Sequence, residues 1–208
     1  MLSVHPDQSV TATAPRGTTP EAADARVRRR APWVLKQIRR VQFEYRPREP
    51  RRFVSGASFY LLGRELRLKV RRDQIESVAV KRPYLYVYSR RISEAGIETT
   101  LRDWRAEQAR ARFAERLKEL APRILGRGTS VPAYRVVAMK RRWGSCSSRG
   151  TISLNPWLTE HPGGCIDYVL IHELCHLRHL NHGRDFERLL GRLLPDWRRW
   201  KRRLEGQM

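Results

Sequence analysis

One stretch of the chain decides how the rest is interpreted: His172-Glu173-Leu174-Cys175-His176-Leu177-Arg178-His179-Leu180-Asn181-His182. It has the pattern H-E-x-x-H, followed by five residues and a third histidine. Residues four apart lie on the same face of an α-helix, so His172 and His176 can present their imidazoles to one metal ion. Glu173 is offset by one residue, and it can reach a water beside that ion without binding the ion itself.

The third histidine, His182, lies too far along the chain to share this helical face. The segment Asn181-His182-Gly183 can end the helix and return the imidazole to the metal. Three protein ligands with one open position are typical of catalytic zinc, whereas structural zinc usually takes four ligands. His179 is the alternative third ligand, on a continuing helix. We prefer His182, because a return after the helix end leaves the fourth position open.

The composition indicates a globular protein with a large excess of positive charge. Of the 208 residues, 40% are hydrophobic and 31% are charged, and 43 Lys and Arg against 21 Asp and Glu give a net charge of +22. This excess favours contact with polyanions such as nucleic acid, although it is spread along the chain. There is no apolar run long enough for a membrane span and no secretory signal near the N-terminus, so we expect a cytoplasmic protein without membrane contact.

The cysteines do not indicate a disulfide framework. The chain has three, Cys146, Cys165 and Cys175, with no C-x-x-C pair. An odd count without close pairs also argues against a cysteine-based zinc ribbon. Cys175 precedes His176 by one residue and therefore points to another helical face, where a small buried core residue is expected.

Three regions follow from the residue patterns. We expect a disordered basic tail over residues 1–31, an N-terminal β-rich module over residues 32–100 and a catalytic domain over residues 101–208. Within the β-rich module, alternating apolar residues predict the strands of a small antiparallel sheet, at residues 41–45, 58–62, 65–70, 77–80 and 84–88.

The catalytic region begins with a change to helical periodicity. A helix is predicted over residues 101–125, closed by Pro122 and the Gly126-Arg127-Gly128 turn. A β-hairpin is predicted from residues 134–139 and 151–155, joined by a polar connection over residues 140–150. An exposed strand edge of this hairpin would hold an extended peptide through main-chain hydrogen bonds. Two helices after the histidine motif, at residues 185–194 and 196–204, are expected to brace the metal helix.

Several motifs in one order carry a resemblance to a known family. They are Arg142-Trp143-Gly144-Ser145-Cys146, Leu154-Asn155, Asp167-Tyr168-Val169 and the histidine motif up to Gly183. Together they resemble the YgjP-like metallopeptidase domain family, which is related to SprT-like zinc proteases, over roughly residues 55–205. The resemblance implies an α+β fold of the zincin-like (minigluzincin) type, zinc on His172, His176 and His182, and Glu173 as general base. The pair Phe186-Glu187 stands where the family usually has Phe-Trp.

Three functional hypotheses remain open on the sequence. The first is hydrolysis of a protein or peptide by a water that zinc binds and Glu173 activates. The second is nucleotide (UTP) pyrophosphohydrolysis, which is assigned to a branch of the family. The third is a DNA-associated protease or binding protein that uses the basic surface. The same fold and metal can serve each of these.

Two residues before the motif are candidate contacts to substrate or transition state. Arg142 would stabilise an oxyanion or a phosphate, or would instead pair with a carboxylate such as Asp167. Trp143 adjoins it in the same connection. Asn155 and Tyr168 are interpreted as structural residues rather than catalytic ones.

Overall fold

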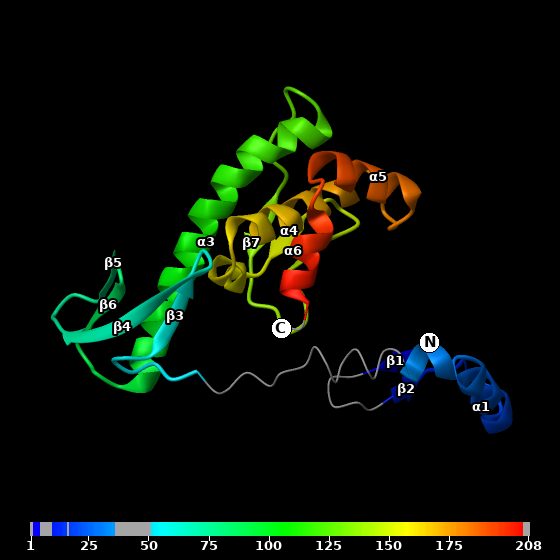
Figure 1. Cartoon of the computed structure of the whole chain (residues 1–208), viewed down its shortest axis with the longest axis horizontal. Helices are drawn as coiled ribbons and strands as arrows, with labels where there is room; N and C mark the ends of the chain where they lie inside the picture. The colour runs from blue at the N-terminus through cyan, green and yellow to red at the C-terminus, as the bar shows by residue number, and fades with distance from the viewer. Residues whose placement is uncertain (1, 5–9, 16, 36–50, 206–208) are drawn as a thin grey trace. The chain divides into compact units, whose positions relative to one another are not determined.

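A computed structural model describes residues 2–4, 10–15, 17–35 and 51–205 (Figure 1). Its contacts divide the chain into two compact units, Met1–Pro50 with Glu205–Gln207, and Arg51–Leu204 with Met208. No helix among the described residues is long and apolar enough to cross a membrane. The domain boundaries proposed at residues 31 and 100 stay predictions.

The first unit contains secondary structure where the sequence predicts a disordered tail. Strand β1 (Leu2–Val4) pairs antiparallel with β2 (Val10–Ala12), and helix α1 covers Pro20–Arg29. Thr19 caps α1 by accepting a hydrogen bond from the Ala22 amide at 3.3 Å, and Pro20 occupies the first turn. The helix buries none of its residues, so it has no apolar period to reveal it. The strand predicted at residues 41–45 lies outside the described residues.

The second unit begins with a four-stranded sheet. Its strands are β3 (Ser58–Leu61), β4 (Arg64–Arg72), β5 (Ser77–Lys81) and β6 (Tyr84–Ser89), in the order β3-β4-β6-β5. The strands lie close to their predicted positions, but the prediction of an all-antiparallel sheet is wrong. The β5–β6 hairpin folds back so that β6 runs parallel to β4. The alternation of apolar and polar residues indicates which face of a strand is buried. It does not indicate which strand lies next to it or in which direction that strand runs.

One face of this sheet packs on the first half of a long helix, α3 (Glu94–Leu125). The predicted helix starts at residue 101; the observed one starts seven residues earlier, because Ser93 caps it through a 3.2 Å bond from the Gly96 amide. Pro122 lies inside the last turn rather than after it. Gly126 ends the helix with a φ of 110°, a conformation that favours glycine.

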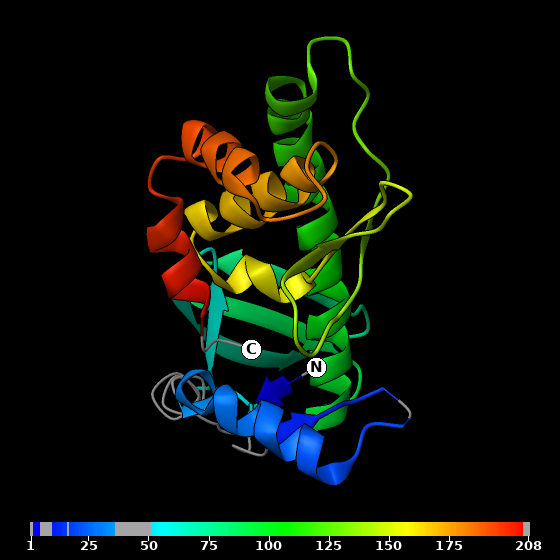
Figure 2. The ribbon, with the colours of Figure 1, turned by 90° about the vertical axis from the view of Figure 1, so that its right-hand side faces the viewer.

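The second half of α3 packs in another core, together with the elements that follow it in the chain. These are β7 (Tyr134–Val136), β8 (Gly144–Cys146), β9 (Ile152–Leu154), the 3₁₀ helix η1 (Pro156–Glu160), α4 (Gly163–His176), α5 (Arg184–Leu193) and α6 (Trp197–Leu204). Figure 2 shows the three C-terminal helices together beside α3.

The three-stranded sheet corrects the predicted hairpin. Its order is β7-β9-β8, with β7 parallel to β9 and β8 antiparallel to it. The hairpin partner of β9 is therefore β8, which lies inside the predicted polar connection. Gly144-Ser145-Cys146 has no apolar alternation that would mark a strand. As a result β8, and not residues 134–139, forms the strand edge nearest to α4.

Helices α5 and α6 both pack on α4, as the sequence predicts. Trp197 of α6 stacks on Tyr168 of α4, with ring centroids 6.4 Å apart and planes 8° apart. Gly164 makes a close approach possible, because a Cβ at that position would lie 2.3 Å from the Trp200 ring. Arg116 of α3 fixes the other side of α4 through a two-pronged ion pair with Asp167, at 2.8 and 2.9 Å.

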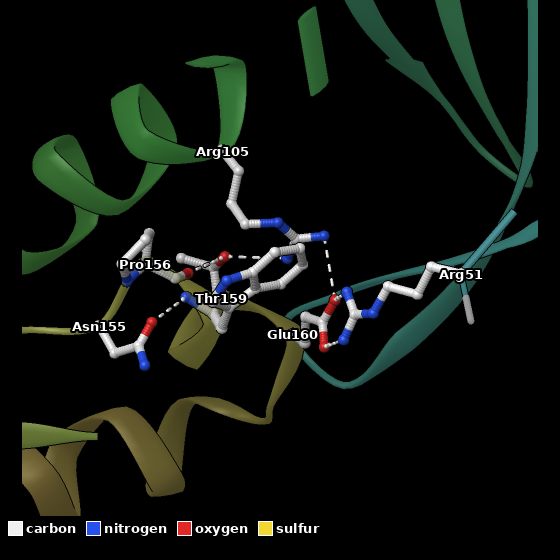
Figure 3. Close-up of polar contacts among 7 residues, drawn as sticks. Arg51, Arg105, Asn155, Pro156, Thr159 and Glu160 are labelled. Atoms are coloured by element: carbon white, nitrogen blue, oxygen red, sulfur yellow. Dashed lines mark hydrogen bonds and ion pairs between the residues drawn. The ribbon is translucent and has the colours of Figure 1, made fainter. Parts of the chain in front are cut away.

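A buried charge cluster joins the sheet, α3 and η1 (Figure 3). Arg105 of α3 is 3% exposed and lies 3.0 Å from the Glu160 carboxylate. Its guanidinium stacks between the rings of Phe59 and Trp157, at 4.4 and 4.3 Å from their centroids. Arg51 binds the same carboxylate with both its terminal nitrogens. Glu160 therefore neutralises two cations, one of them fully enclosed.

We expect Glu160→Gln to destabilise the protein by about 3 kcal/mol or more, because it removes the carboxylate that pairs with Arg105, which is buried beside a second guanidinium. Urea unfolding measures this. The control is Glu115→Gln, which removes an exposed partner of Arg112 and should cost less than about 1 kcal/mol. Equal costs for the two variants would contradict the role given to the cluster.

Candidate metal centre

Three imidazoles meet at the C-terminal end of α4. The Nε2 atom of His172 lies 3.3 Å from that of His176 and 3.0 Å from that of His182. Helix α4 ends at His176 with Leu177 as its C-cap, so His182 reaches the cluster from the segment beyond the helix. One ligand atom from each of the three histidines falls within 4.8 Å of the others. The predicted return of the chain after the helix is present.

These separations fit a tetrahedral metal ion. Zinc–nitrogen bonds of about 2.0–2.1 Å at tetrahedral angles place neighbouring nitrogens about 3.3 Å apart. The ligand set consists of three imidazole nitrogens, which suit zinc and other divalent transition metals better than magnesium or calcium. Residues His172, His176 and His182 therefore form a site that a divalent metal could occupy with one position left open.

The protonation of the cluster favours metal binding. Burial, followed by the charges of His176 and His182, lowers the pKa of His172 to about 4, so this imidazole is neutral at pH 7. Its Nδ1 atom is buried and has no hydrogen-bond partner among the described residues. The Nδ1 atom of His176 lies 3.2 Å from the backbone oxygen of His179. With a proton on Nδ1, His176 donates to that carbonyl and keeps the Nε2 lone pair for the metal.

The backbone oxygen of His179 therefore contacts the His176 ring, and the imidazole of His179 is not one of the three clustered rings. The carbonyl holds the His176 ring in one orientation, a role that the spacing of the histidines does not reveal. This geometry favours His182 over His179 as the third ligand, and the ligand assignment stays a prediction.

Phe186 positions all three rings. Its side chain is 2% exposed, and its ring centroid lies 5.0, 4.8 and 4.6 Å from those of His172, His176 and His182. From the sequence, Phe186 is noted only as part of the pair Phe186-Glu187, with no role at the metal site. Its spacing of four residues after His182, in the first turn of the next helix, is the signal that could have linked it to the centre. Tyr168 adds a further ring contact with His172, at 5.8 Å.

Glu173 is the buried carboxyl group beside the histidines. It is 5% exposed, and burial raises its pKa to about 7 against a smaller lowering effect of Arg142. Strand β8 passes so close that a Cβ on Gly144 would lie 2.7 Å from the Glu173 Oε1 atom. Glycine is therefore required at position 144 for β8 to approach Glu173, a role that the motif alone does not disclose.

The centre opens into a cavity of about 390 Å³. The cavity is bordered by β8 and the turn after it on one side, and by α4 and the segment after it on the other. Its lining residues are Gly144, Ser145, Cys146, Ser147, Ser148, His172, Glu173, His176, Leu180 and His182. All three cysteines are free, and Cys146, in this lining, has its thiol pKa raised by burial and by Glu173.

Arg142 and Trp143 lie outside this lining. Arg142 is exposed and acts on Glu173 through its charge. It does not pair with Asp167 as the alternative interpretation suggests, because that carboxylate is bound by Arg116. Trp143 is 8% exposed, donates from Nε1 to the Leu204 carbonyl at 3.4 Å and contacts the His161 ring edge-on. The structure places Trp143 in the core rather than in the cavity.

Asn155 has a structural role in the strand connection. Its side-chain amide donates to the carbonyl oxygens of Met139 and Arg142, at 2.8 and 3.0 Å, and its Oδ1 atom accepts from the Trp157 amide. These bonds tie the segment before β8 to the start of η1. Asn155 therefore helps to fix the position of β8, and through it the approach of Gly144 to Glu173.

Three histidines that could hold a metal ion, beside a buried carboxyl group, provide the groups that a metal-dependent hydrolase needs. The chain belongs to the YgjP-like metallopeptidase domain family, whose profile matches residues 1–207. This confirms the resemblance drawn from the sequence motifs.

Comparison with solved structures finds the metallopeptidase zymogen of Pyrococcus abyssi abylysin. The two chains are 28% identical, the match covers 44% of this chain and 90% of that chain, and the TM-score is 0.40. No curated protein matches the sequence.

The third ligand can be tested by metal content. We expect His182→Ala to lose most of the bound metal, because it removes one of three nitrogens at the centre. His179→Ala should retain metal close to the wild-type ratio, since the backbone oxygen that holds His176 remains. Elemental analysis of the purified proteins gives the ratio. Loss of metal from His179→Ala with retention in His182→Ala would reverse the assignment.

The burial of Glu173 predicts a pH-dependent stability difference in metal-free protein. Folding raises the pKa of this carboxyl group from 4.5 to about 7, so the folded state binds its proton more tightly than the unfolded state does. The protein therefore loses stability as pH rises from about 4.5 to 7. We therefore expect Glu173→Gln to match the wild type near pH 4.5 and to exceed its stability above pH 7, by at most about 3 kcal/mol. Denaturant unfolding of chelator-treated proteins measures this. A difference that is constant with pH would contradict the raised pKa.

Proposed function

We propose that the chain is a zinc-dependent peptidase of the zincin type, in which Glu173 is the general base and His172, His176 and His182 hold the metal. The observation that carries this proposal is the position of a buried carboxyl group at the same cavity as three converging imidazoles. Zinc is the metal proposed, because it accepts neutral imidazoles in a four-coordinate site.

When bound, zinc would supply a Lewis acid that polarises the scissile carbonyl and makes a water acidic enough to ionise near neutral pH. Glu173 accepts the proton of the attacking water and delivers it to the leaving amine. In the metal-free protein burial raises the pKa of this carboxyl group to about 7. A bound dication would lower that pKa and favour the ionised form, which can accept a proton. Gly144 keeps the space beside the carboxylate free of a side chain.

Strand β8 offers a binding edge for an extended peptide. It is an edge strand of its sheet, and its residues line the cavity. On the β9 side, the Trp143 carbonyl accepts a hydrogen bond from the Asn155 amide, and the Ser147 amide donates one to the Thr151 carbonyl. In an antiparallel ladder the residues between bonded positions turn their backbone groups the other way. The amide and carbonyl of Gly144 and Cys146 therefore point away from β9, where a substrate strand could pair.

The cavity fits a peptide better than a nucleoside triphosphate. Among its described lining residues, none is Lys or Arg, so the phosphates of UTP would have no side-chain cation to bind there. A peptide needs main-chain hydrogen bonds and one general base, which β8 and Glu173 provide.

We expect Glu173→Gln to lower turnover of an unfolded protein substrate by roughly 10²–10⁴-fold, because proton transfer in the transition state is lost. Its zinc content should equal that of the wild type, since all three imidazoles remain. The control is Glu107→Gln, an exposed carboxylate on α3, which should leave turnover unchanged. The same preparations are assayed with UTP.

Full proteolytic activity of the Glu173→Gln variant would show that Glu173 is not the general base. Hydrolysis of UTP without hydrolysis of any unfolded protein would reject the peptidase proposal in favour of nucleotide chemistry.

A further inference from the structure

The outer face of the four-stranded sheet carries a row of tyrosines. Along β6, Leu85 and Val87 are fully buried against α3, so Tyr84, Tyr86 and Tyr88 project from the opposite side. These three rings are half-buried among their neighbours and do not belong to either hydrophobic core. Strand packing against α3 therefore does not account for them.

Each of these tyrosines has a basic residue opposite it on the neighbouring strand. Strands β4 and β6 are parallel and in register, with Arg67 opposite Tyr84, Lys69 opposite Tyr86 and Arg71 opposite Tyr88. Paired residues in adjacent strands share one face of the sheet. We call this set of six residues the tyrosine face: Tyr84, Tyr86, Tyr88, Arg67, Lys69 and Arg71.

The rings form a continuous row. Their centroids are 6.1 Å apart from Tyr84 to Tyr86 and 6.3 Å apart from Tyr86 to Tyr88, and the second pair is stacked with planes 16° apart. Lys69 Nζ lies 3.6 Å from the Tyr84 ring centroid, and Lys81 of β5 lies 6.0 Å from that of Tyr86. Cations thus flank the row from both neighbouring strands.

The charge of the sheet is one-sided. The four strands contain six Lys or Arg residues and a single acidic residue, Glu65, at the start of β4. Arg71 and Lys81 are exposed, and no carboxylate pairs with either among the described residues. Glu65 lies on the same face and pairs with Arg67 at 3.7 Å. A polyanion would therefore meet a surface whose positive excess comes mainly from Lys69, Arg71 and Lys81.

We propose that the tyrosine face binds single-stranded nucleic acid, with unpaired bases stacked on Tyr84, Tyr86 and Tyr88 and phosphates bound by Arg67, Lys69 and Arg71. A flat sheet with two or three exposed aromatic residues is a surface on which successive bases stack. Cations along the same strands track the backbone, and this combination tolerates many sequences. An acidic peptide would satisfy the cations but would leave the aromatic row without a partner.

The test is fluorescence anisotropy of the full chain with labelled twenty-residue oligothymidine, oligouridine, a duplex and an abasic strand of equal length. We expect both single strands to bind more tightly than the duplex and the abasic strand, because only unpaired bases can stack. The ratio of the oligouridine and oligothymidine affinities shows whether RNA or DNA is the preferred source. Equal affinity for the oligothymidine and the abasic strand would overturn the proposal.

Replacement of the aromatic row tests the stacking directly. Tyr86→Leu keeps an apolar side chain suited to a strand and removes the ring, and it should weaken binding of oligothymidine by roughly 5- to 150-fold. The control Tyr60→Leu changes an exposed tyrosine on β3 whose cross-strand partner is Glu65, and it should bind as the wild type does. Equal binding by wild type and both variants would overturn the proposal.

Charge-matched variants separate this face from the general positive charge of the chain. The triple variant Arg67→Gln, Lys69→Gln, Arg71→Gln should lose affinity, and the slope of log K against log salt should fall by about 2. The control Lys118→Gln, Arg123→Gln, Arg127→Gln removes the same charges from the exposed far end of α3 and the turn after it. An equal loss in both triple variants would mean diffuse electrostatic binding and would overturn the proposal. Thermal melts confirm that each variant is folded.

Discussion

The candidate centre depends on three imidazole nitrogens held close together, with the Nε2 atom of His172 3.3 Å from that of His176 and 3.0 Å from that of His182. Lone pairs at such distances repel one another unless a cation or a shared proton lies between them. The scaffold must therefore hold the rings firmly before any ligand binds, and the structure shows how it does so. Phe186 packs against all three rings, and the His179 carbonyl fixes His176. Binding free energy of a metal then offsets the cost of this arrangement.

The positions of the histidines depend in turn on how helix α4 is held by its neighbours. The Arg116–Asp167 ion pair fixes it on one side, and the stacking of Trp197 on Tyr168 fixes it on another. Strand β8 then comes within contact distance of Glu173 because residue 144 has no side chain. The same burial that raises the pKa of Glu173 to about 7 makes its ionised form costly. The proposed catalytic group thus costs stability in the metal-free protein, as functional groups commonly do.

The features that could be predicted from the sequence are those set by residues close together in the chain. The spacing of His172, His176 and His182 predicted a shared face and a return after the helix, and both are present. The strands of the four-stranded sheet and the two helices after the motif also lie close to their predicted positions. Helix α1 was missed because it buries nothing, and β8 because Gly144-Ser145-Cys146 has no alternation. Strand order, the ring contacts of Phe186 and the position of Trp143 depend on tertiary packing, which no periodicity encodes.

The most direct test of the metal centre is X-ray absorption spectroscopy of the zinc-loaded protein. The account predicts three imidazole nitrogens at about 2.0–2.1 Å and one oxygen ligand, with no sulfur near 2.3 Å. Multiple scattering from imidazole rings counts the histidines directly. A sulfur shell, which would place Cys146 on the metal, or a closed set of four protein ligands would contradict the account.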